Sequence, residues 1–79
     1  MFTVIEMLYS RGLLFHESPV GCYQDELTAE DAAYRFALAY KPEFPEHNSV
    51  YWVFNTKIEK LISDFDSRSC KAVHKAIHG

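Results

Sequence analysis

Cysteine and histidine recur at four-residue intervals near the C-terminus, at Cys70, His74 and His78. On a helix this spacing places all three on one side, and thiolate and imidazole are preferred Zn²⁺ ligands. However, Cys70 also shares a stripe with Val73 and Ile77, where a thiol behaves as a small apolar group. A histidine near a helix C-terminus is also favoured by the helix dipole. A closed site would need a fourth ligand from elsewhere, so we expect no metal and no cofactor, and a metal-binding domain at these three residues is the second alternative hypothesis.

Two cysteine–histidine pairs have the residue types of a nucleophile and its base, namely Cys70 with His74 and Cys22 with His16. Neither pair lies in a catalytic-cysteine signature. The three glycines are isolated, so no glycine-rich loop can hold a phosphate group. The HExxH and GxSxG motifs are missing as well. The sequence therefore predicts a protein that is not an enzyme.

Basic side chains form a second pattern, because Arg68, Lys71 and Lys75 fall on one face of the last predicted helix. Such a stripe could contact phosphate groups of a nucleic acid. Nucleic-acid-binding domains usually have a pI above about 9, whereas this chain has a net charge of −3 and a pI near 5.7. Nucleic-acid contact is thus an alternative hypothesis, and a solvated helix face is the simpler interpretation.

The N-terminal segment is rich in β-branched and aromatic residues, which favours a strand over about residues 2–9. Thr3 and Glu6 have the spacing of a capping box and Gly12 could end a helix, so a helix over residues 4–11 is the alternative. Further extended chain follows, interrupted by the turn-forming residues 18–21. These segments predict an irregular antiparallel hairpin.

A helix is predicted from an N-cap at Thr28 to about Tyr40. Ala33, Phe36, Ala37 and Tyr40 form one stripe, and its small alanines would allow close packing on a sheet. Pro42 and Pro45 then end the helix.

The segment 49–54 is the clearest strand. Thr56 and Glu59 next form a capping box, and Ile58, Leu61, Ile62 and Phe65 have helical spacing. We therefore expect a helix that breaks near Asp66, and a last helix over about residues 67–77. The predicted fold is a single α+β domain, residues 1–79, with two layers, a three-stranded antiparallel sheet and helices on one face, in the order β-β-α-β-α-α.

Both faces of the strand at 49–55 are apolar, since Val50, Trp52 and Phe54 alternate with Tyr51 and Val53. Helices on one side would leave the other apolar face uncovered, and such faces are typical of partner-binding surfaces. The alternative is that residues 41–48 or the N-terminal segment fold over that face.

The leading hypothesis is a small protein-interaction module that acts by binding. We expect Tyr51, Tyr9, Tyr23 and Val53 to contact the partner, with Trp52 in the core. The partner would be another protein or a second copy of the chain. Two cysteines are too few for a disulfide scaffold and no apolar run could span a bilayer, so we expect a cytoplasmic protein. The short format without motifs is similar to that of small phage or mobile-element proteins, which implies an inhibitor or adaptor.

Overall fold

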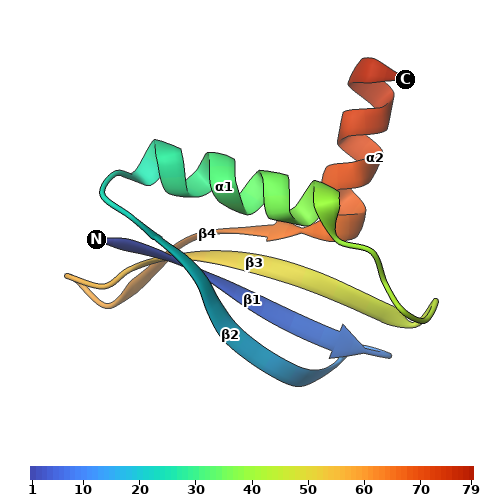
Figure 1. Ribbon diagram of the computed structural model, residues 1–79, viewed down its shortest axis with the longest axis horizontal. Helices are drawn as coiled ribbons and strands as arrows, with labels where there is room; N and C mark the ends of the chain where they lie inside the picture. The colour runs from blue at the N-terminus through green and yellow to red at the C-terminus, as the bar shows by residue number, and fades with distance from the viewer.

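The computed structural model describes residues 1–79 and contains one four-stranded antiparallel sheet with two helices on one side (Figure 1). The strands lie in the spatial order β2-β1-β3-β4. Their bounds are β1 (Phe2–Ser10), β2 (Leu13–Tyr23), β3 (His47–Asn55) and β4 (Lys60–Asp66), and the helices are α1 (Glu26–Ala39) and α2 (Ser67–His78). The predicted α+β class is confirmed. The predicted strand count is wrong by one, because the order is β-β-α-β-β-α.

The extra strand is β4, which replaces the helix expected from the capping box at Thr56. Asn55 instead forms a turn, because its Oδ1 accepts hydrogen bonds from the backbone N–H groups of Lys57 and Ile58. Glu59 then has a φ of 53°, a left-handed conformation that ends the turn. The chain can therefore return beside β3 as a hairpin partner, so tertiary pairing overrides the local helical signal.

The N-terminal segment is a strand, as the β-branched residues predicted, and not the alternative helix. Arg11 and Gly12 have φ values of 53° and 79° and make the tight turn into β2. The β1–β2 register shifts twice, between Val4 and Ile5 and between Leu8 and Tyr9. The expected irregular hairpin is therefore present.

Helix α1 begins earlier than predicted, because Asp25 and not Thr28 is its N-cap. The Asp25 carboxylate accepts hydrogen bonds from both the backbone N–H and the hydroxyl of Thr28. These bonds hold the pKa of Asp25 below its usual value. The helix ends at Ala39, one residue before the predicted limit.

Three alanines spaced by four residues, Ala29, Ala33 and Ala37, are fully buried where α1 lies on the sheet. They face Val4 of β1 and Val53 of β3, which are also fully buried. Because none of these side chains is large, the helix backbone lies close to the strands. The close packing predicted for Ala33 and Ala37 is confirmed, and the third buried alanine is Ala29, which lies outside the predicted stripe.

The largest buried side chain is Tyr51, at 2% exposure. Its ring stacks on Phe36 of α1 with centroids 5.7 Å apart. Its hydroxyl donates a 2.7 Å hydrogen bond to the Glu6 carboxylate on β1. Burial, together with this hydrogen bond, raises the pKa of Tyr51 far above its usual value. The Tyr51 phenol is therefore a neutral hydrogen-bond donor to Glu6 at neutral pH.

Helix α2 begins at Ser67, as predicted, directly after β4. A buried network fixes this junction: the Ser67 hydroxyl donates to Asn48 Oδ1 at 2.8 Å and accepts from the backbone N–H of Ser49 at 3.3 Å. From this base α2 extends away from the sheet, past the C-terminal end of α1 (Figure 1). Val73 and Ile77 on its later turns are 54% and 69% exposed. Neither helix has the length and hydrophobicity needed to cross a bilayer.

Candidate interaction surface

The sheet face opposite the helices, here called the open face, has no second layer over it (Figure 1). Side chains alternate between the two faces of a strand, so the neighbours of the buried residues Val4, Tyr51 and Val53 point to the open face. The apolar members of this set on the two central strands are Ile5, Met7, Tyr9, Val50, Trp52 and Phe54. Most of them are half-buried by one another, and only Met7 is fully shielded.

Cross-strand neighbours arrange the open face in rows, and carboxylates stand at three of the four ends of its two central rows. One row runs Glu17, Met7, Val50 and Asp66 across the four strands. The next row runs Pro19, Ile5, Trp52 and Asp64. The open face is therefore an apolar band, two strands wide, with carboxylates along its lateral edges.

The predicted assignment of the two sheet faces is wrong. The expected contact residues Tyr51 and Val53 are 2% and 0% exposed beneath α1, so a partner cannot touch them. Tyr23 packs against the same core from β2. Of the four expected contact residues only Tyr9 lies on the open face. Trp52, expected in the core, lies there as well.

The predicted alternation of side chains along β3 is present, but alternation cannot decide which face the helices cover. Glu6 on β1 gives a misleading signal, because a carboxylate between apolar residues usually marks the exposed face of a strand. A carboxylate on a covered face needs a hydrogen-bond donor, and among its cross-strand neighbours the Tyr51 hydroxyl supplies one. The alternative cover by residues 41–48 is not formed, because Phe44 packs edge-on against His47 with centroids 5.1 Å apart.

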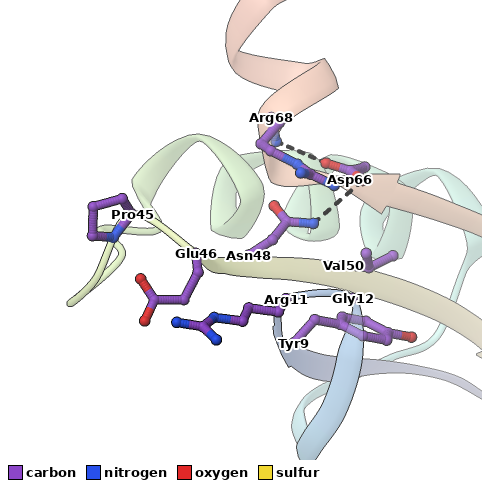
Figure 2. A pocket seen from close by; sticks show the side chains of 9 residues that line it. All are labelled: Tyr9, Arg11, Gly12, Pro45, Glu46, Asn48, Val50, Asp66 and Arg68. Atoms are coloured by element: carbon purple, nitrogen blue, oxygen red, sulfur yellow. Dashed lines mark hydrogen bonds and ion pairs between the residues drawn. The ribbon is translucent and has the colours of Figure 1, made fainter.

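At one end of the open face lies a hollow of about 470 Å³ lined by Tyr9 and Val50 and by several charged residues (Figure 2). Asp66 accepts hydrogen bonds from the Arg68 backbone N–H at 2.9 Å and from Asn48 Nδ2 at 3.4 Å. The Arg68 guanidinium lies 3.6 Å from the same carboxylate. These groups satisfy one another and cap α2, so the polar part of the hollow serves the β4–α2 junction.

The Cys70, His74 and His78 series is brought partly together. The two imidazole centroids are 4.3 Å apart, and His74 Nδ1 lies 3.3 Å from the Tyr34 hydroxyl. Cys70 is buried against the helix-covered core. No three histidine, cysteine, aspartate or glutamate side chains are close enough to hold a metal ion.

The two thiols should differ in reactivity. Cys22 is exposed, whereas Cys70 is buried, and burial together with the nearby Asp66 raises the pKa of the Cys70 thiol. Because the thiolate is the reactive form, we expect Cys70 to react with a disulfide reagent at least about tenfold more slowly than Cys22. The variants Cys22→Ser and Cys70→Ser isolate the two rates. Equal rates in the folded protein would contradict the burial of Cys70.

The basic stripe on α2 is partly engaged within the chain. The Lys71 ammonium donates to the carbonyl oxygen of Tyr40 and lies 5.6 Å from the centroid of the Tyr40 ring. Arg68 is paired with Asp66. Of the three cations expected to contact nucleic acid, Lys75 has neither kind of contact.

No family model matches the chain, and no curated protein or solved structure matches it. The function of the open face must therefore follow from the chemistry of its own residues.

Proposed function

We propose that this protein acts by binding another protein through the open face, as an inhibitor or adaptor and without catalysing a reaction. The observation that carries the proposal is a continuous apolar band on the open face, over which no helix or strand of the chain packs. Its residues are Ile5, Tyr9, Val50, Trp52 and Phe54. Aromatic residues at the centre of a surface are the types that most often carry binding energy.

Carboxylates beside the apolar band support a partner of positive charge. Glu17 on β2 and Asp64 on β4 flank the apolar band. A partner that presented acidic groups there would be repelled, whereas lysine or arginine would be attracted. We therefore propose a partner with an apolar patch flanked by basic side chains.

Trp52 is the chain's one tryptophan and lies at the centre of the band, so it tests the proposal directly. We expect Trp52→Ser to weaken partner binding by at least about thirtyfold, the loss typical of a central aromatic residue. The control is Leu27→Ser, which removes an apolar side chain that is 78% exposed on α1. Proteins captured from cell extract by the wild type and by the control, but not by Trp52→Ser, would be identified by mass spectrometry.

A purified partner should then shift the Trp52 emission to shorter wavelength, because binding removes the indole from water. The competing hypothesis is that a second copy of the chain covers the open face, and light scattering over a concentration series tests it. A dimer that Trp52→Ser dissociates would show that a second copy covers the open face, and the proposal of a different partner protein would fail. An unchanged emission spectrum in the complex would also overturn it.

A further inference from the structure

The outer edge of β4 is a second surface, which borders the open face at Asp64. β4 ends the sheet, so it pairs with β3 on one side and with no strand on the other. Exposed strand edges present free backbone N–H and C=O groups to any extended chain. The opposite edge, β2, is less suitable, because Pro19 has no N–H group and the pairing of β2 with β1 shifts register twice, whereas that of β4 with β3 shifts once.

A groove of about 350 Å³ follows this free edge. Its lining includes Asp64 and Phe65, which are adjacent residues with side chains on opposite faces of the sheet, so the groove runs along the edge itself. Tyr34, Cys70 and Val73 of the helices complete its apolar wall. The groove is thus bounded by backbone, apolar side chains and a carboxylate.

The position of α2 supports a strand in this groove. Val73 lines the groove and is 54% exposed, and Ile77 continues the same stripe at 69% exposure. Free helical turns gain their stability mainly from packing of an apolar face. A fifth strand beside β4 would place its helix-side residues next to Phe65 and Val73, and would cover part of this stripe.

We infer that the free edge of β4 binds an extended segment of another protein in which apolar and basic residues alternate. Residues of that segment on the helix side would contact Phe65 and Val73. Residues on the other side would lie beside Asp64, an exposed carboxylate that forms no ion pair within the chain, where positive charge is favoured across strands.

The probe is a fluorescein-labelled peptide of about seven residues that alternates valine and lysine, matched to a typical strand length and measured by anisotropy. We expect it to bind, and the corresponding valine–glutamate peptide to bind at least about tenfold more weakly. A valine–lysine peptide with N-methylated alternate amides should not bind, because strand addition depends on main-chain hydrogen bonds.

Asp64→Lys should reverse the charge preference, so that the glutamate peptide becomes the tighter ligand. Glu43→Lys makes the same change in net charge at an exposed loop residue and should leave the preference unchanged. Val73→Ser should weaken binding of the lysine peptide, since it removes part of the apolar wall.

The inference and the proposed function can fail separately. Trp52→Ser alters the open face and should leave peptide binding unaffected. If Trp52→Ser abolishes peptide binding, or if the N-methylated peptide binds as well as the parent, the peptide does not pair with β4 and the inference is overturned. Absence of binding by the valine–lysine peptide overturns it too, without bearing on the open face.

Discussion

Replacement of Tyr51 by alanine is expected to lower the free energy of unfolding by about 3–5 kcal/mol, the usual cost of removing a large buried aromatic side chain. The side chain is 2% exposed and stacks on Phe36, so the change leaves a cavity between α1 and the sheet. Only 11 of the 79 residues are buried, and a domain with so small a core has little stability to lose. Urea denaturation followed by circular dichroism would measure the loss.

The matched variant Tyr51→Phe separates the ring from its hydroxyl. It keeps the stacking on Phe36 but leaves the Glu6 carboxylate without its 2.7 Å donor. We expect a smaller loss of about 1–2 kcal/mol. If Tyr51→Ala were as stable as the wild type, Tyr51 would not be a core residue, and the description of which face α1 covers would be wrong.

The second large effect is expected from Ala33→Leu. Ala33 is fully buried at the centre of the alanine stripe, so a leucine there must displace the helix from Val4 and Val53. Overpacking of this kind typically costs about 1–3 kcal/mol. The measurement is again the urea midpoint, compared between variant and wild type.

The control for this variant is Ala39→Leu, at the exposed end of the same helix. It makes the same chemical change where there is space, and should alter stability by less than about 0.5 kcal/mol. Equal losses at positions 33 and 39 would show that leucine acts through helix propensity or the unfolded state, and not through close packing of α1.

Much of the fold could be predicted because several signals are local. The first strand, the alanine stripe of α1, the strand at 49–54 and the last helix all have patterns that tertiary contacts reinforce. β4 has the opposite character. Leu61 and Ile62 are adjacent apolar residues, which interrupts the alternation of a strand and, with Phe65, gives the spacing of a helix. The strand accommodates this pair by a bulge, because a register shift between Val53 and Phe54 makes Ile62 an extra residue.

The candidate surface could be predicted in kind but not in detail. An uncovered apolar face follows from β3 alone, because both of its faces are apolar. Which of the two faces of β3 the helices cover depends on which side chains α1 can pack against closely. The alanines of α1 accommodate the flat stacking of Tyr51 on Phe36, and Trp52 is left on the other side. That choice rests on contacts between elements far apart in the sequence, which residue types on one strand do not show.

The order of the strands has a consequence for how the chain folds. β1 lies inside the sheet, and its inner neighbour is β3, so Phe2 pairs with Asn55 and Ser10 with His47. The hairpins β1–β2 and β3–β4 are closed by short turns and can form early, whereas the seam between them requires closure of a long loop. On the ribosome, β1 emerges first but cannot acquire its second neighbour until Asn55 has been synthesised. We therefore expect the joining of the two hairpins beneath α1 to limit the folding rate.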